Sequence, residues 1–299
     1  MTELSIVIPT KDRPEALART VAELEAQEEE RAEIVVIDNG SAPAALQQAR
    51  EIVAGAERAR LVECAKRGPA AARNAGVAAA AGEVLLFLGD DTAPAGAGLL
   101  RAHLDLHAAR PAEGYGVLGR ISWDPRREIT PFMRWLENGG PQFAYADIGA
   151  GPVAASHYFY SSHASVKRAF FDRVGGFDER FPDAAVEDTE LGVRLGDAGL
   201  EFDYHPELLV LHDHPTVLAG SLDRLVRVGR SAALYNELRP DRPHPDIAAP
   251  RGPAWSALRV LRPAIDLAAR LPAPTPVRER LWYAMHLARY AQGYRLGPP

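Results

Sequence analysis

The first hundred residues alternate short β-branched runs with stretches of helical spacing, and this alternation constrains the fold more than any other feature. The apolar runs predict strands over Leu4–Ile8, Glu33–Ile37, Arg60–Cys64 and Val84–Leu88. The segments between them predict helices over Pro14–Glu29, Ala42–Ala54 and Ala70–Ala81, the first with Asp12 as its N-cap. Strands separated by crossover helices pair in parallel. We therefore predict an α/β fold with a mostly parallel central sheet.

The alternation stops after residue 115, and proline, glycine and aromatic residues become common between Trp123 and Tyr160. Beyond that stretch we expect a strand over Tyr158–Lys167, helices over Arg168–Val174 and Val186–Asp197, and a short buried strand over Leu208–Leu211. From Ser221 onward, helical segments alternate with the proline-rich linkers Arg239–Pro253 and Leu271–Pro276. We therefore expect one domain over residues 1–220, with halves at 1–115 and 116–220, and an all-helical appendage over 221–299.

The composition is that of a globular chain of 299 residues, with 47% hydrophobic residues and a formal charge of −6. This mild acidity argues against a protein whose main task is to bind nucleic acid, because such binding requires a basic face. The single cysteine, Cys64, excludes an intramolecular disulfide and a multi-cysteine metal site, and we expect it to be buried in a strand. The chain begins without a secretory leader and has no apolar run long enough to span a membrane. We therefore expect a cytoplasmic protein.

Polar residues follow all four predicted strands at their carboxyl ends, where the ligands of parallel sheets bind. Neither of the usual glycine-rich nucleotide motifs, GxGxxG after the first strand or a P-loop, is present. Carboxylates could serve a nucleotide instead. Asp38 could accept from a base imide or a ribose hydroxyl, and Asp90 with Asp91 could hold a hard cation that bridges phosphates. Arg67 and Arg73 could face a diphosphate, although an ordinary surface role for either stays open.

Six segments, in order, carry a resemblance to a known family. They are Leu4–Arg13 (LSIVIPTKDR), Glu33–Ser41 (EIVVIDNGS), Ala71–Gly76 (AARNAG), Leu86–Asp91 (LFLGDD), Val174–Phe181 (VGGFDERF) and Glu187–Leu195 (EDTELGVRL). Together they resemble the family 2 glycosyltransferases of the GT-A fold. The resemblance implies an inverting enzyme that moves a sugar from a nucleoside diphosphate sugar, with a UDP-sugar as first candidate, to a glycan, lipid-linked or small-molecule hydroxyl. It makes residues 1–115 the nucleotide-binding half and 116–220 the acceptor-binding half.

The resemblance also implies roles for individual residues. The nucleotide pocket would contain Pro9, Thr10, Asp12 and Arg13, with Asp38 and Asn39 at the base, and Arg67 and Arg73 toward the diphosphate or base. Asp90 and Asp91 match the acidic metal motif, in which Asp91 would hold Mg²⁺ or Mn²⁺ and Asp90 would lie nearer the ribose. Many relatives have Asp-x-Asp at this point, whereas this sequence has Gly89 in place of the first carboxylate.

Glu187 and Asp188 resemble the acceptor-side motif of the family, with Asp188 as the general base. A carboxylate that takes the proton of the acceptor hydroxyl typically contributes about 10²- to 10⁴-fold in rate. A second interpretation stays open, because acidic residues are also favoured in the first turn of a helix by its dipole.

Two histidines follow the last predicted strand. In relatives a histidine in this region often supplies a third metal ligand, and His212 matches it best, with His214 second. We expect the two imidazoles to point to opposite faces of the extended segment and therefore not to bind one ion together. A histidine without any metal, exposed or hydrogen-bonded, is the alternative. His163 stands where many relatives have asparagine, and we assign it no role.

Residues 251–299 form a basic tail of charge +6. It has arginines at positions 251, 259, 262, 270, 278, 280, 289 and 295, but only two acids, Asp266 and Glu279. Apolar residues recur beside these arginines, so the tail predicts basic amphipathic helices. Such helices could lie on an anionic membrane surface, or they could pack on the catalytic domain or on the second subunit of a homodimer.

Two other functions are compatible with the same sheet. A nucleotidyltransferase would make a sugar nucleotide from a triphosphate, but such enzymes usually have a glycine-rich basic loop where this chain has Pro9–Arg13. A non-catalytic protein that binds a sugar nucleotide or a glycan is the other alternative. It is weakened by the presence of both the metal carboxylates and a candidate base.

Overall fold

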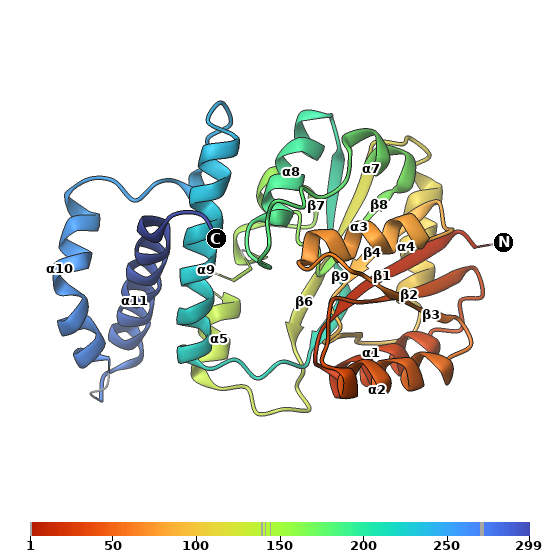
Figure 1. Ribbon diagram of the computed structural model, residues 1–299, viewed down its shortest axis with the longest axis horizontal. Helices are drawn as coiled ribbons and strands as arrows, with labels where there is room; N and C mark the ends of the chain where they lie inside the picture. Colours follow the sequence, from red (N-terminus) through yellow and green to blue (C-terminus); the bar gives the residue numbers. More distant parts are fainter. Residues whose placement is uncertain (1, 139, 141, 144, 270–271) are drawn as a thin grey trace. The chain divides into compact units, whose positions relative to one another are not determined.

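The computed structural model describes residues 2–138, 140, 142–143, 145–269 and 272–299, which belong to two units (Figure 1). The first unit contains residues 1–128, 148–182 and 187–214, and the second contains 129–147, 183–186 and 215–299. Arg270 and Leu271, part of the basic tail and of its predicted linker, lie outside the described residues.

The described residues of the first unit form a nine-stranded sheet in the order β3-β2-β1-β4-β8-β6-β9-β5, with β7 beside β9. The four strands expected from the alternation pair with one another in parallel: β1 (Leu4–Thr10), β2 (Ala32–Asp38), β3 (Ala59–Glu63) and β4 (Val84–Leu88). The helices between them are α1 (Pro14–Glu25), α2 (Pro43–Ala54) and α3 (Pro69–Ala79). Register places Thr10 opposite Asp38, so β1 and β2 end side by side. The predicted α/β fold is confirmed.

The rest of the sheet mixes strand directions. β8 (His163–Lys167) lies antiparallel between β4 and β6 (Tyr115–Trp123), and β6 pairs in parallel with β9 (Glu201–His212). The short strands β5 (Thr92–Pro94) and β7 (Gly151–Pro152) pair antiparallel with β9. Helices α4 (Leu99–Ala109), α6 (Ala155–Tyr158), α7 (Arg168–Val174) and α8 (Glu187–Asp197) complete this unit. Because Thr92 pairs with His212, the end of β9 lies beside the segment that follows β4.

Two predicted strands differ from those of the structure by more than two residues at one end. The strand expected over Tyr158–Lys167 begins only at His163, because Ala155–Tyr158 forms the short helix α6. The strand expected over Leu208–Leu211 is the last part of the twelve-residue strand β9.

Two single-residue predictions are also wrong. Asp12 is not the cap of α1: the N-cap is Arg13, without a side-chain hydrogen bond, and Asp12 has a φ of 55°. The Oδ1 atom of Asp12 instead accepts from the backbone nitrogen of Ala42 at 2.7 Å. Cys64 is not buried in a strand, because β3 ends one residue earlier and the side chain is partly exposed.

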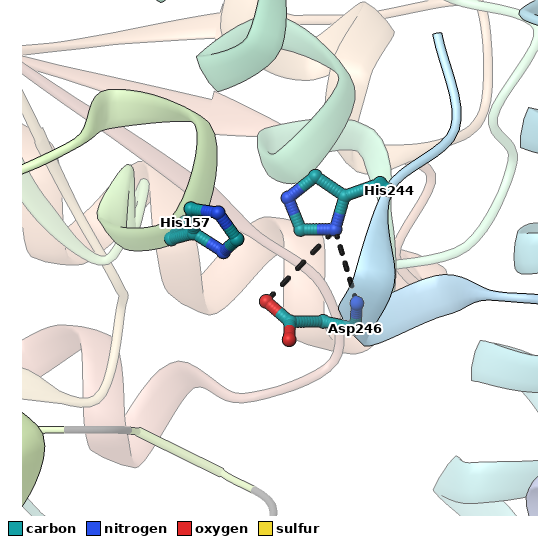
Figure 2. Close-up of side chains that lie close together, drawn as sticks. All are labelled: His157, His244 and Asp246. Carbon is teal, nitrogen blue, oxygen red and sulfur yellow. Dashed lines mark hydrogen bonds and ion pairs between the residues drawn. The ribbon is translucent and has the colours of Figure 1, made fainter.

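The second unit is helical. It contains α5 (Pro131–Asn138), α9 (Leu218–Leu238), α10 (Pro253–Ala268) and α11 (Thr275–Leu296), with 3-10 turns over Tyr145–Asp147 and Pro245–Ile247. Glycine lets α9 and α11 approach closely, because a Cβ atom at Gly229 would lie 2.1 Å from the carbonyl oxygen of Tyr290. In the second 3-10 turn, the backbone nitrogen of Asp246 donates to Nδ1 of His244 at 3.3 Å (Figure 2).

Aromatic packing attaches α5 to the C-terminal helices. The ring centroids of Phe132 and Trp282 lie 5.1 Å apart, and those of Trp135 and His286 lie 5.2 Å apart. Residues 129–147 therefore group with the helical unit, whereas we had included them in the acceptor-binding half. In the part of the chain that the structure describes, no helix is both long enough and apolar enough to cross a membrane.

Candidate active site

Two consecutive aspartates follow the most deeply buried strand of the sheet. Every residue of β4 is buried, and the chain leaves it through Gly89 to reach Asp90 and Asp91. Asp90 is only 1% exposed, and its Oδ2 atom accepts from the hydroxyl of Thr10 at 2.7 Å. A Cβ atom at Gly89 would lie 2.8 Å from Oδ1 of Asp91. A side chain at position 89 would therefore require the carboxylate of Asp91 to turn.

One guanidinium bridges both carboxylates. Nη1 of Arg13 lies 2.5 Å from Oδ2 of Asp91, and its Nη2 lies 2.6 Å from Oδ1 of Asp90. Burial raises the pKa of Asp90 to about 6, and repulsion from Asp91 adds to the shift. Burial also opposes ionisation of Asp91, but the hydrogen bond from His212 and the charges of His212 and Arg13 hold its pKa below the usual range.

The end of β9 brings His212 and His214 to the same carboxylate. Nε2 of His212 lies 3.3 Å from Oδ2 of Asp91, and Nδ1 of His214 lies 3.9 Å from that atom. The two rings stack, with centroids 5.8 Å apart and planes inclined by 22°. The expectation that they face opposite sides is wrong, because residues two apart in an extended segment share a face.

Several other side chains around these histidines were not predicted from the sequence. Trp123, the last residue of β6, stacks on the ring of His212 at a centroid distance of 5.1 Å. The carboxylate of Asp213 pairs with Arg19 at 2.6 Å and with Arg127 at 2.8 Å. The backbone nitrogen of Asp213 donates to the carbonyl of Asp91 at 2.9 Å. The only sequence signal for Trp123 is its position near the end of the regular pattern, and its partner is distant in the chain.

This cluster has the chemistry of a divalent cation site. Asp91 and Asp90 offer carboxylate oxygens, which suit Mg²⁺ and Mn²⁺, and His212 offers a nitrogen beside the same oxygen atom. An imidazole ligand suits Mn²⁺ better than Mg²⁺, which prefers oxygen ligands. These residues therefore fit Mg²⁺ or Mn²⁺, the metal predicted from the sequence. His214 is more exposed and lies at the edge of the site.

Asp38 is the last residue of β2, and only one of its carboxylate oxygens accepts hydrogen bonds from the described residues. Oδ2 accepts from the backbone nitrogens of Gly40 and Ser41, at 3.0 and 3.2 Å. Oδ1 is buried and accepts no hydrogen bond from the residues that the structure describes. A buried acceptor without a donor is costly, so this oxygen fits an N–H or O–H group of a ligand.

The loops around Asp38 are connected by polar side chains. The amide of Asn39 donates to the carbonyl of Lys66 at 2.9 Å and accepts from the nitrogen of Gly68 at 2.8 Å. The backbone nitrogen of Asp12 donates to the hydroxyl of Ser41 at 2.9 Å. Asn39 and Asp12 thus fix the loops of the predicted pocket. Pro9 is half-buried in β1, and Arg67 is exposed, with its Nε 3.6 Å from where a Cβ of Gly40 would lie.

Arg73 and Glu187 form a buried ion pair. Nη1 of Arg73, on α3, donates to Oε1 of Glu187, at the start of α8, at 2.9 Å. The two side chains are 9% and 3% exposed, and the guanidinium lies 5.4 Å from the ring centroid of Phe177. Glu187 therefore holds α8 against α3. Asp188 is only half-buried, and its Oδ1 accepts from the backbone nitrogen of Thr189 at 2.9 Å.

His163 lies in the core beside β4. It pairs with Leu88, is fully buried, and its Nε2 lies 3.2 Å from Nε2 of His103. Its Nδ1 lies 3.1 Å from the carbonyl oxygen of Arg120. Its ring is thus held by protein groups on both nitrogens.

The comparison with protein families decides the class. The model of glycosyl transferase family 2 matches residues 5–174, which include β1, Asp38 and both aspartates after β4. The chain belongs to glycosyl transferase family 2. Asp188 and the two histidines lie beyond the matched segment.

Two curated proteins are similar to most of the chain. A pre-mycofactocin glycosyltransferase of Mycobacterium tuberculosis is 30% identical over 255 residues, which cover 81% of this chain and 49% of that protein. A validoxylamine A glucosyltransferase of Streptomyces hygroscopicus is 33% identical over 225 residues, 66% of this chain and 52% of that protein. The chain therefore spans about half the length of these relatives.

Two solved structures have the same fold. The mannosyltransferase PcManGT from Pyrobaculum calidifontis, in complex with GDP-Man and Mn²⁺, gives a TM-score of 0.65 at 18% identity, over 98% of this chain and 87% of that one. TarS of S. aureus, in complex with UDP, gives 0.56 at 14% identity, over 99% and 92%. These likenesses support the GT-A fold.

Proposed function

We propose that this chain is an inverting glycosyltransferase that moves a sugar from a nucleoside diphosphate sugar to a hydroxyl acceptor with the help of Mn²⁺ or Mg²⁺. The proposal rests above all on the meeting of Asp90, Asp91 and His212 at the ends of β4 and β9. A cation bound there would neutralise the charge that develops on the leaving diphosphate. Asp91 and His212 would hold it, with Asp90 nearer the ribose and His214 as a possible further ligand.

The donor nucleotide would lie across the ends of β1 and β2. The spare oxygen of Asp38 would accept from the base, and we propose a UDP-sugar first because uracil presents one imide N–H to such an acceptor. Guanine also presents a ring N–H, and the solved neighbours hold either GDP-Man or UDP. Thermal-shift screening against uridine, guanosine and thymidine diphosphate sugars with Mn²⁺ would identify the base by the largest stabilisation.

Asp188 would act as the general base. The acceptor oxygen attacks the anomeric carbon opposite the diphosphate, so one C–O bond forms while the bond from that carbon to the phosphate oxygen breaks. The acceptor proton goes to the carboxylate of Asp188, and the electron pair leaves with the diphosphate. Glu187 would act as a positioning residue, because its carboxylate is buried against Arg73.

Substitution tests the base directly. We expect Asp188→Asn to lower kcat by at least about 10²-fold while leaving donor binding nearly unchanged, because only proton transfer is lost. Asp197→Asn, on the exposed end of the same helix, is the matched control and should keep full activity. Full turnover in the Asp188 variant would remove this residue as the base.

Chelation tests the cation, and the products test the reaction. Removal of divalent ions should suppress turnover and added Mn²⁺ should restore it, whereas unchanged turnover in chelator would overturn the role of Asp91. Release of a nucleoside diphosphate supports glycosyl transfer. Pyrophosphate would point instead to a nucleotidyltransferase, and the absence of any product with every acceptor class would point to a binding protein.

We also propose that α10 contacts an anionic membrane surface, which would favour a lipid-linked acceptor. One side of α10 faces α11: the rings of Trp255 and Tyr290 lie 6.2 Å apart, and Arg262 donates to Gln292 at 2.8 Å. The other side is apolar yet open, with Val260 at 72% and Leu267 at 63% exposed. A helix that is apolar on both sides is normally covered on both.

Charge favours lipid as the cover. Within the described tail, Arg251, Arg259 and Arg280 are exposed near the two helices, whereas the carboxylate of Asp266 lies 3.6 Å from both Arg262 and Arg289. The exposed side of α10 therefore presents no acid of its own helix. An apolar face bordered by arginine suits the cytoplasmic leaflet, where anionic lipids are concentrated. The enzyme would then work in the cytoplasm at the inner face of the membrane.

Vesicle flotation separates this proposal from a homodimer. We expect binding to phosphatidylcholine vesicles only when phosphatidylserine is included, and loss of that binding in the double variant Val260→Ser, Leu267→Ser. Val217→Ser is the matched control, because Val217 is 65% exposed but lies outside α10. Binding that survives the double variant would overturn the proposal. A dimer in solution that the same variant dissociates would assign the face to a second subunit instead.

A further inference from the structure

The guanidinium of Arg13 stands in the middle of the carboxylate cluster. It contacts Asp91 through Nη1 at 2.5 Å and Asp90 through Nη2 at 2.6 Å. Within the described part of the chain, its hydrogen bonds and ion pairs are with these two carboxylates alone. The aspartate side chains are 1% and 10% exposed, whereas that of Arg13 is 42% exposed. The cationic side chain can therefore withdraw toward solvent, and the carboxylates cannot.

The same oxygen would have to serve two cations. Oδ2 of Asp91 accepts from Arg13 and is also the atom nearest to His212 and His214. A divalent ion bound by Asp91 and His212 would approach this oxygen closely. Its double charge would repel a guanidinium at hydrogen-bond distance from the same atom. The ion and Arg13 therefore compete for this oxygen.

We propose that Arg13 is a built-in counter-ion that holds the two aspartates until the divalent ion and the donor arrive together. The inference rests on the proposed metal site. Two buried carboxylates without a cation would repel each other, and Arg13 offsets that charge in the free enzyme. Once displaced, the guanidinium stays in the nucleotide pocket, where its planar donors can bind the donor diphosphate. The metal then binds weakly alone and tightly with the donor, which limits its loss or exchange between turnovers.

Metal binding without donor tests the inference. Titration of free Mn²⁺, followed by electron paramagnetic resonance, should give about tenfold tighter binding in Arg13→Ala than in the natural protein, because a charged hydrogen bond no longer competes. Arg13→Lys should lie between them. Arg19→Ala is the matched control: this arginine is on α1, whose N-cap is Arg13, and it is equally exposed at 42%, but it pairs with Asp213. Its Mn²⁺ affinity should change by no more than about twofold.

Thermal unfolding supplies an independent readout. Without metal, Arg13→Ala should melt at a lower temperature than the natural protein, because the carboxylates lose their counter-ion. Mn²⁺ should then raise its Tm by more than it raises that of the natural protein. Equal or weaker Mn²⁺ binding by Arg13→Ala would overturn the role of Arg13 alone. If neither protein binds Mn²⁺, with or without a donor, the metal site itself falls and this inference falls with it.

Discussion

Two clusters of ionisable side chains are buried near the end of β4, and they differ in charge: one is charged and compensated, and the other is neutral. Asp90 and Asp91 have cationic or polar partners, above all Arg13, at hydrogen-bond distance. The second cluster contains His103, His107 and His163, which are at most 3% exposed. Burial lowers the pKa of His107 to about 3 and that of His163 to about 4, and it holds the pKa of His103 well below its usual value. The charges of the first cluster are compensated by a cationic side chain, and the histidines of the second stay neutral.

Neutral rings give the histidine cluster a single direction of hydrogen bonding. The carbonyl of Arg120 can only accept, so Nδ1 of His163 donates to it and Nε2 of His163 must accept from His103. Nδ1 of His103 then accepts from the hydroxyl of Ser165, which in turn accepts from Nε2 of His107. These hydrogen bonds form a row from the carbonyl of Arg120 to His107, which we call the histidine row. The row ends at Nδ1 of His107, which is buried without a hydrogen-bond partner among the described residues. One added proton would break this order.

Lowering the pH should therefore give the largest difference between the two clusters in their effect on the free energy of unfolding. A histidine held neutral in the fold, with an unfolded pKa near 6.5, stabilises the protein fully above that pH and loses about 1.4 kcal/mol per pH unit below it. Three such residues predict a loss of about 4 kcal/mol in the free energy of unfolding between pH 7.5 and 5.5. Asp90, whose pKa is raised to about 6, opposes this loss by about 1 kcal/mol, because protonation favours its folded form.

Urea unfolding at the two pH values measures this loss. His107→Gln should remove about 1.4 kcal/mol of the pH dependence, which is nearly half of the net loss, whatever it does to stability at neutral pH. His157→Gln changes an exposed histidine and should leave the dependence unchanged. A pH dependence that is the same in both variants would show that the buried ring takes up its proton without unfolding, and the contrast with Asp90 would be lost.

Filling the space beside the histidine row should have the next largest effect on the free energy of unfolding. A Cβ atom at Gly119, on β6, would lie 2.0 Å from the ring of His163, so the ring would have to leave its two hydrogen bonds. We expect Gly119→Ala to cost about 3 kcal/mol in urea unfolding. Gly116→Ala on the same strand meets its nearest atoms at 3.1 Å and should cost clearly less. Equal costs would mean that strand propensity, and not the histidine row, governs this site.

The sequence predicts those parts of the molecule that depend on neighbouring residues. The bounds of β4 and of α7 agree with prediction, because an unbroken apolar run and the glycine at position 175, with a φ of 90°, mark their ends locally. The resemblance to the family implied that Asp91 and His212 bind one metal ion. The two side chains lie 3.3 Å apart, and the metal stays a prediction.

Partners distant in the chain could not be predicted in this way. The guanidinium of Arg73 pairs with Glu187, which lies 114 residues further along the chain, and nothing near either residue in the sequence indicates this pair. The spacing of His103 and His107 indicates one helix face, and nothing in it indicates that Ser165 lies between them. Such contacts depend on which strands become neighbours. The insertion of β8 between β4 and β6 decides that order in this protein.

Removal of the hydroxyl that connects two histidines tests the row without changing its space. Ser165→Ala deprives Nδ1 of His103 of its donor and Nε2 of His107 of its acceptor, and both rings stay buried. We expect a loss of about 2 kcal/mol in the free energy of unfolding at pH 7.5. Ser165→Thr restores the hydroxyl and should recover part of the loss. A neutral result for Ser165→Ala would mean that water replaces the hydroxyl.

The matching change in the carboxylate cluster should have the smallest effect. Thr10→Val removes the hydroxyl that donates to Oδ2 of Asp90 but keeps the shape of the side chain. Asp90 would still have Arg13 at 2.6 Å, so its charge would stay compensated, and we expect a loss of about 1 kcal/mol in urea unfolding. In an Arg13→Ala background the same change should cost more, because the hydroxyl is then the nearest remaining donor. If the cost of Thr10→Val does not depend on Arg13, the two groups do not share the charge of Asp90, and the contrast between a compensated and a neutral cluster would need another cause.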